Sequence, residues 1–121
     1  MDRNIVVSAV QVGDVFQNPR SGTSAVVSVT DLNISYMRRS SRISLSIDAF
    51  LSVVTSFTGR KCTSTDLREY LPKVFSTKNG GHDCNCTFLF RVAEKMQLVE
   101  NGIQGKGTAG NPFYVTFKRT I

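Results

Sequence analysis

The spacing of hydrophobic residues changes within residues 87–117, TFLFRVAEKMQLVENGIQGKGTAGNPFYVTF, and this change decides the fold. The first half has apolar residues three or four positions apart, as on the buried face of a helix: Leu89, Val92, Ala93 and Met96. The predicted helix covers residues 85–97. A glycine-rich segment over 102–110 and a strand-forming run from Phe113 to Phe117 come after it. They predict a β-hairpin with a glycine-rich tip.

Two further helices are predicted upstream. The first has helical spacing at Phe50, Leu51, Val54 and Phe57, with Ser46 or Asp48 at its start and Gly59 at its end. The second lies in TSTDLREYLPKVF, residues 63–75, where Thr63 or Ser64 caps the start and Asp66 favours the first turn. Pro72 ends or kinks this helix at Leu71.

The N-terminal third of the chain has a different period. From residue 12 to 47 apolar residues alternate with polar ones, and the turn-like segments QNPRSG, TDLN and RSSR interrupt the alternation. The second predicted strand is lined by Val27 and Val29. This spacing predicts a four-stranded antiparallel meander, so the fold class is α+β. Residues 1–46 form the meander and 47–121 the helical part, together one compact unit.

Residues 47–119 resemble the winged helix-turn-helix family through TSTDLREYL, the apolar face of TFLFRVAEKMQLV and the hairpin GIQGKGTAGNPFYV. The resemblance implies three helices and a β-hairpin wing, with the third helix in the major groove of DNA. The link over residues 72–83 is longer than in a tight helix-turn-helix. Residues 12–50 weakly resemble the small sheets of SH3 and Tudor domains, through VGDVF, AVVSV and NISYMRR.

The composition points to an anionic partner. The chain has fifteen Lys and Arg residues and nine Asp and Glu residues, which gives it a formal net charge of +6. No apolar run is long enough to span a bilayer, and the start of the chain has no signal-peptide pattern. Three cysteines fit a reducing compartment without disulfides, and a cytoplasmic location is expected. A homodimer or a protein partner is compatible with the sequence.

The predicted helix over 85–97 carries polar residues on its other face. Asn85, Thr87 and Arg91 are expected near base edges. Phosphate contacts are expected from other basic residues: Lys95, Lys78, Arg68 and, at the hairpin tip, Lys106. Arg38 and Arg39 at another hairpin tip either extend this surface or protect an edge strand.

The segment GHDCNC, residues 81–86, raises the question of a metal site. His82, Cys84 and Cys86, with Cys62 upstream, are ligand types for zinc, but their spacing is not that of the usual paired knuckles. The other alternative is a catalytic nucleophile formed by Cys84 or Cys86 with His82. Free cysteines at the start of the helix are favoured over both the zinc site and the nucleophile. Either Asp83 or Asn85 is expected to cap the helix. We therefore predict no enzyme and no cofactor.

The predicted function is selective binding of double-stranded DNA by a small regulatory or recognition module. The alternative is a non-catalytic protein-interaction module, an adaptor or inhibitor, that uses the winged-helix surface. The two differ in salt dependence, because contacts with phosphates weaken steeply as salt rises and an apolar protein interface does not.

Overall fold

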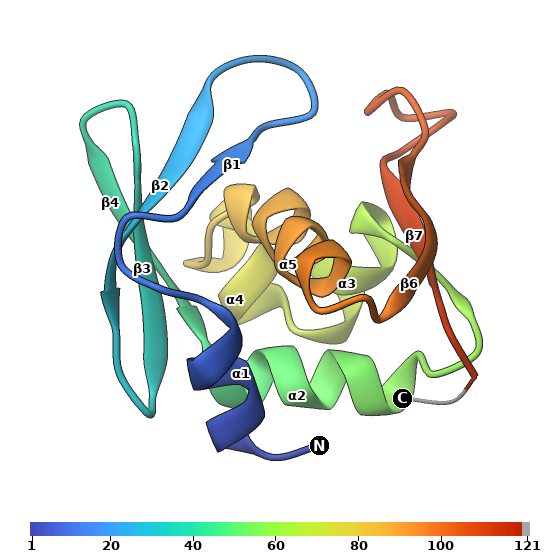
Figure 1. Ribbon diagram of the computed structural model, residues 1–121. Helices are drawn as coiled ribbons and strands as arrows, with labels where there is room; N and C mark the ends of the chain where they lie inside the picture. Colours follow the sequence, from blue (N-terminus) through green and yellow to red (C-terminus); the bar gives the residue numbers. More distant parts are fainter. Residues whose placement is uncertain (120–121) are drawn as a thin grey trace.

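The computed structural model describes residues 1–119, which fold as a mixed α+β protein with two antiparallel sheets (Figure 1). The predicted fold class is confirmed at this level. The first half contains α1 (Arg3–Ala9), β1 (Val15–Gln17), β2 (Thr23–Val29), β3 (Asn33–Arg38), β4 (Ser41–Ser46) and α2 (Ile47–Ser56). The second half contains β5 (Lys61–Thr63), α3 (Ser64–Tyr70), α4 (Pro72–Phe75), the 3-10 turn η1 (Thr77–Asn79), α5 (Cys84–Lys95), β6 (Val99–Gln104) and β7 (Tyr114–Phe117). Within residues 1–119, no helix combines the length and the apolar character that crossing a bilayer requires.

The four-stranded sheet is the predicted meander, with strands in the order β1-β2-β3-β4 and every pair antiparallel. One detail differs from the sequence prediction. The pairing of β2 with β3 shifts between Val26 and Ser28, as at a β-bulge. Strict alternation is therefore broken. Val26 is buried and Val27 is exposed, so the prediction that Val27 lines the core side of this strand is wrong.

Local sequence signals set the helix boundaries as predicted. The Ser46 hydroxyl accepts a hydrogen bond from the Ala49 amide, 3.2 Å away, at the start of α2. Thr63 and Asp66 form a reciprocal capping box at the start of α3. Pro72 occupies the first turn of α4, so the second predicted helix is divided at Leu71. The long link before α5 contains α4 and η1. The helix α1 was not predicted from the sequence.

The second sheet has three strands in the order β5-β7-β6. The predicted hairpin is its β6–β7 pair, in which Val99 lies opposite Phe117. The short strand β5, which was not predicted, pairs with β7 through Cys62 and Val115. Consequently α2, α3 and α5 precede the hairpin in the predicted order, and an additional strand ties the hairpin to the start of α3.

Helix α5 lies at the centre of the molecule, between the four-stranded sheet and the β5-β7-β6 sheet (Figure 1). The Phe88 ring stacks on Tyr36 of β3 with centroids 3.8 Å apart, and Phe16 of β1 meets it edge-on at 5.6 Å. A single cluster of buried apolar side chains includes residues from both sides, such as Ile34 and Leu89. The meander and the helical part therefore share one core.

Candidate functional site

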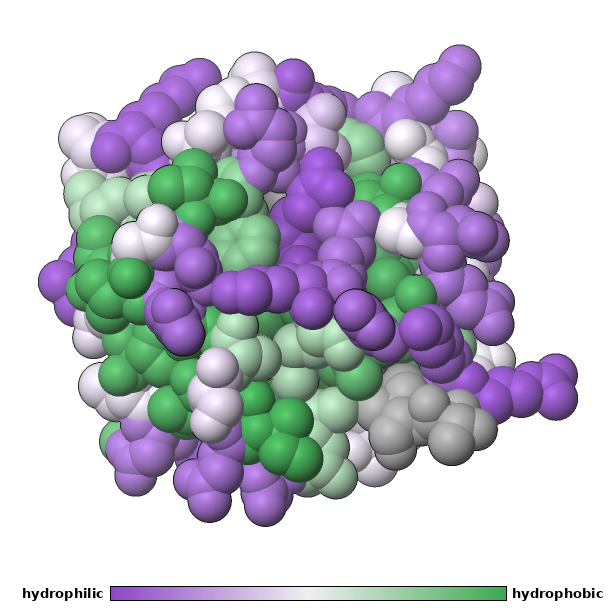
Figure 2. All heavy atoms as spheres, in the orientation of Figure 1, coloured by the Kyte–Doolittle hydropathy of each residue, from purple (hydrophilic) through white to green (hydrophobic). Residues whose placement is uncertain are grey.

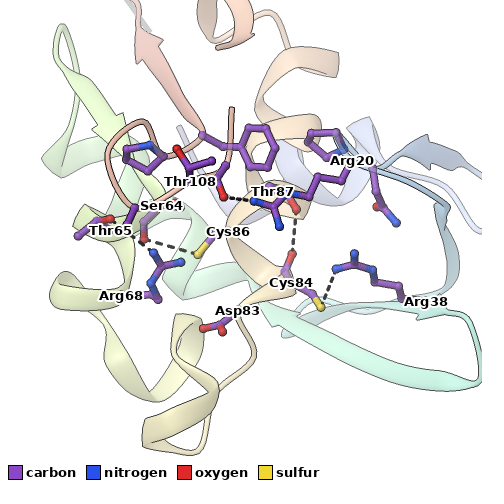
Figure 3. A pocket seen from close by; sticks show the side chains of 16 residues that line it. Arg20, Arg38, Ser64, Thr65, Arg68, Asp83, Cys84, Cys86, Thr87 and Thr108 are labelled. Carbon is purple, nitrogen blue, oxygen red and sulfur yellow. Dashed lines mark hydrogen bonds between the residues drawn. The ribbon is translucent and has the colours of Figure 1, made fainter. Parts of the chain in front are cut away.

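An open hollow of about 300 Å³ lies where the meander meets the helical part of the chain. We call it the arginine groove. Its walls come from the β1–β2 loop, the end of β3, the start of α3, the start of α5 and the β6–β7 hairpin (Figure 3). The residues that line it are Asn18, Pro19, Arg20, Arg38, Ser64, Thr65, Arg68, Asp83, Cys84, Cys86, Thr87, Gly107, Thr108, Ala109, Pro112 and Phe113.

The three arginines of the arginine groove approach it from different elements. Arg38, the last residue of β3, donates from Nη1 to the Cys84 sulfur at 2.9 Å. Arg68 lies on α3, and its Nη2 donates to the Thr65 hydroxyl at a long 3.4 Å. Figure 3 shows Arg38 and Arg68 on opposite sides of Cys84. Their guanidinium groups therefore flank the start of α5.

Arg20 connects the β1–β2 loop to the hairpin. Its guanidinium donates to the Gly107 carbonyl oxygen and lies 5.8 Å from the centre of the Phe113 ring. Gly107 has a φ of +75°, and a Cβ there would lie 2.4 Å from Phe113 Cε2. Only glycine suits this backbone and this close approach. The hairpin is thus packed onto the side of the arginine groove, and the neighbouring Lys106 is exposed.

The arginine groove has more positive than negative charge. Across residues 1–119 the ion pairs are Arg3–Asp48, Arg91–Glu94 and Lys95–Asp14, and none involves Arg20, Arg38 or Arg68. The only carboxylate in the lining is Asp83, and its Oδ1 accepts a hydrogen bond from the Thr77 amide at 3.1 Å. Three guanidinium groups without carboxylate partners are what a bound anion requires.

Asp83 holds the N-cap position of α5, as one of the sequence alternatives predicted, but its side chain makes no capping hydrogen bond. Instead it accepts from the Thr77 amide, while the Thr77 hydroxyl accepts from the Asp83 amide at 3.0 Å. Asn85, the other predicted cap, does not cap the helix. The carboxylate therefore fixes η1 against the start of α5.

The cysteines do not form the zinc cluster that the sequence raised as an alternative. Within the described residues, no three His, Cys, Asp or Glu side chains lie close enough together to hold a metal ion. Cys62 and Cys86 are buried, and this burial raises the pKa of both thiols, that of Cys86 to about 12. The Cys86 thiol donates to the carbonyl oxygens of Ser64 and Phe75. Only Cys84 is partly accessible, beside Arg38, while His82 is exposed.

The prediction that Asn85 reads base edges is wrong, because the side chain is buried with 1% exposure. Its Oδ1 accepts a hydrogen bond from the Tyr36 hydroxyl at 2.8 Å. Its Nδ2 donates to the carbonyl oxygens of Ser44 at 3.2 Å and Val74 at 3.1 Å. The four-stranded sheet covers this face of α5, so the amide satisfies buried polar groups there. Tyr36 was a signal for this network, since a buried hydroxyl needs a partner.

Arg91 and Lys95 of α5 do not form the free outward face that was predicted, because both bind groups of the protein, although Lys95 remains exposed. Arg91 donates from Nε to the Gln17 carbonyl oxygen at 2.8 Å and from Nη1 to Glu94 at 2.8 Å. Lys95 forms an ion pair with Asp14. Strand β1 and the loop before it therefore occupy the positions at which a DNA backbone was expected.

The other predicted contact residues fall into two groups. Thr87, Arg68 and Arg38 line the arginine groove, and Arg39 lines two neighbouring hollows, of about 220 and 310 Å³, that share Arg38 with it. Lys106 is adjacent to Gly107 at the hairpin tip, whereas Lys78 is exposed on η1 outside the lining. Sequence reasoning missed Arg20 and Phe113 as members of the site. Arg20 was visible as a basic residue in the turn segment QNPRSG.

No protein-family model, no curated protein and no solved structure matches this chain. The arrangement of side chains in the arginine groove is thus the basis for assigning a function.

Proposed function

We propose that this protein binds nucleic acid, in the first place double-stranded DNA, with the arginine groove as the centre of the binding surface. The observation that carries the proposal is the convergence of Arg20, Arg38 and Arg68 without carboxylate partners in residues 1–119. Guanidinium groups bind phosphates in two-pronged geometry, and a net charge of +6 favours the approach of a polyanion.

The β6–β7 hairpin is the second element of the proposed surface, because it carries Lys106 between Gly105 and Gly107 next to the arginine groove. In this proposal the DNA does not lie along Arg91 and Lys95, because the meander occupies that side. It approaches the start of α5, where Thr87 faces the arginine groove, and its phosphates are bound by Arg38, Arg39, Arg68 and Lys106.

The proposal is tested by the salt dependence of binding to a labelled duplex, followed by fluorescence anisotropy. Arg68→Gln should weaken binding and lower the slope of log affinity against log salt by about 1, because one phosphate contact is lost. Arg60→Gln is the matched control. Arg60 lies outside the groove lining, where its guanidinium packs 4.9 Å from the centre of the Phe57 ring. Equal slopes for both variants would contradict the proposed surface.

Cys84 offers a second measurement on the unmodified chain. It lines the arginine groove and is partly accessible, whereas Cys62 and Cys86 are buried. A bound duplex should slow alkylation of Cys84 by iodoacetamide, with the two buried thiols unreactive in both states. Binding that is insensitive to salt and leaves the alkylation of Cys84 unchanged would favour the protein-interaction alternative.

A further inference from the structure

The arginine groove has two chemically different ends. At one end Phe113, Pro112 and Pro19 form an apolar wall, with the Arg20 guanidinium over the Phe113 ring, 5.8 Å from its centre. At the other end Arg38 and Arg68 flank the start of α5, with the hydroxyl groups of Thr65 and Thr87 nearby (Figure 3). An aromatic ring with a guanidinium plane is a stacking surface for a nucleobase. Guanidinium groups and hydroxyls that line one hollow are groups that bind a phosphate.

The size of the arginine groove limits what can enter it. A volume of about 300 Å³ is at the lower end of the range for pockets that hold small ligands. A B-form duplex cannot enter such a space, since its major groove alone is about 12 Å wide. A single nucleotide outside the helical stack presents a base and a phosphate together, and these two groups match the two ends of the groove.

Contacts of the hairpin hold the Phe113 end of the groove in place. Gly107 packs against Phe113, and Arg20 holds the Gly107 carbonyl oxygen from the meander side. The amides of Lys106 and Gly107 both donate to the Asn111 carbonyl oxygen at 3.0 Å, which closes the tip. The stacking wall is therefore positioned by contacts within the protein and does not need a ligand to form.

We infer that the arginine groove binds one unpaired nucleotide of the nucleic acid, with its base against Phe113 and Arg20 and its phosphate between Arg38 and Arg68. The inference rests on the proposed function and specifies it: the protein selects DNA in which a nucleotide is out of the duplex. Such a nucleotide has two sources, an internal bulge and an overhanging end. Both supply the same chemistry.

The test compares three labelled DNAs of one sequence in anisotropy titrations. One is a relaxed, fully paired closed circle, one is the same circle with a single-nucleotide bulge, and one is a linear duplex with a one-nucleotide 5′-phosphorylated overhang. The bulged circle should bind at least about tenfold more tightly than the paired circle, because only it offers a base for stacking. The linear duplex with the overhang distinguishes the two sources. Equal affinity for the bulged circle and the overhang means that any unpaired nucleotide is accepted, and a preference for one of these two DNAs identifies the source.

Variants locate the preference in the arginine groove. Arg68→Gln should reduce the ratio of bulged to paired affinity by removing the phosphate partner, and Phe113→Leu should reduce it by removing the stacking surface. Arg60→Gln should leave the ratio unchanged. Thermal unfolding checks each variant. If Phe113→Leu does not fold, Arg68→Gln decides alone, since Arg68 takes part in none of the ion pairs of residues 1–119 and its hydrogen bond to Thr65 is a long 3.4 Å.

A free nucleoside 5′-monophosphate should compete with the bulged circle, and the nucleoside without phosphate should compete at least about tenfold less well. Equal affinity for the paired and bulged circles, together with no competition by the monophosphate, would overturn the inference and leave duplex binding intact. Binding to none of the three DNAs would remove the proposed function and the inference with it.

Discussion

Two regions of this protein place basic side chains beside the meander, and they use them differently. In the first, which we call the meander contact, Arg91 and Lys95 of α5 bind Gln17, Glu94 and Asp14. In the arginine groove, Arg20, Arg38 and Arg68 have no carboxylate partner in the described part of the chain. The comparison teaches that a basic side chain contributes to folding or remains available to a ligand according to the carboxylate groups that the fold brings to it.

The surface of the molecule shows the same division between polar and apolar side chains. Figure 2 shows hydrophilic side chains across the middle of this face and apolar ones gathered at its lower left, around α1 and the neighbouring four-stranded sheet. Exposed large apolar residues of the N-terminal segment include Ile5, Val12 and Leu32. None of these three residues lines the arginine groove.

The largest expected effect concerns the aromatic contact of α5 with the meander. Phe88→Ala removes a ring that is 2% exposed and packs on Tyr36 and Phe16, so it should lower the free energy of unfolding by about 3–5 kcal/mol. Urea denaturation measures this change. Leu32→Ala, at a residue that is 59% exposed, is the control and should change stability by less than about 0.5 kcal/mol. Similar losses for the two variants would mean that the meander does not pack on α5.

The next prediction tests whether Asn85 stabilises the fold as a buried amide or contacts DNA bases. Asn85→Ala leaves the Tyr36 hydroxyl and the Ser44 and Val74 carbonyl groups without their partner, and should cost about 2–3 kcal/mol of stability. Tyr36→Phe should cost about 1 kcal/mol, because it removes one hydrogen bond of this network. Denaturation of both variants and of the double variant gives the coupling between the residues. Unchanged stability with weakened DNA binding would restore the original prediction for Asn85.

A smaller effect is expected from the ion pair of the meander contact. The hydrogen bond from Lys95, with a second from the Gln11 amide, lowers the pKa of Asp14 below its usual value. A lowered carboxyl pKa stabilises the folded state above the pKa of the unfolded chain, about 4, and this contribution is lost as the pH falls below that value. Asp14→Asn should therefore cost about 0.2–1 kcal/mol at pH 7.

The pH series provides the check on this prediction. The difference in stability between Asp14→Asn and the unsubstituted protein should be smaller at a pH below the lowered pKa of Asp14 than at pH 7, since only below that pKa do both proteins lack the charge on residue 14. Thermal or urea unfolding at the two pH values measures it. A difference that grows on acidification would assign the effect to something other than the ion pair.

The smallest effect on stability is expected in the arginine groove. Arg38→Gln and Arg68→Gln should each change the free energy of unfolding by no more than about 0.5 kcal/mol, because neither side chain has a carboxylate partner in residues 1–119. The same variants should weaken DNA binding. A loss of stability as large as that of Asn85→Ala would show that these arginines serve the fold, and the contrast between the two regions would disappear.

The sequence by itself determined the features that depend on neighbouring residues. Ser46, the Thr63–Asp66 capping box and Pro72 set helix boundaries, because caps and breaks act within one turn. The alternation of the meander and the glycine-rich hairpin were also readable, since both are short-range patterns. The bulge at Val26–Ser28 altered the predicted alternation in β2, and in β3 the polar Ser35 is buried together with Ile34 and Tyr36.

Only the tertiary structure decided which side of α5 is covered. Both sides of that helix carry polar residues. The periodicity identified its apolar face, but it could not show that β1 would lie against the side that carries Arg91 and Lys95. The deciding contacts join residues far apart in the chain: Arg91 with Gln17 is separated by 74 positions, and Lys95 with Asp14 by 81. Such contacts depend on how the sheet packs on the helix, so the same packing buried Asn85, paired Arg91 and Lys95, and left Arg38 and Arg68 open at the start of α5.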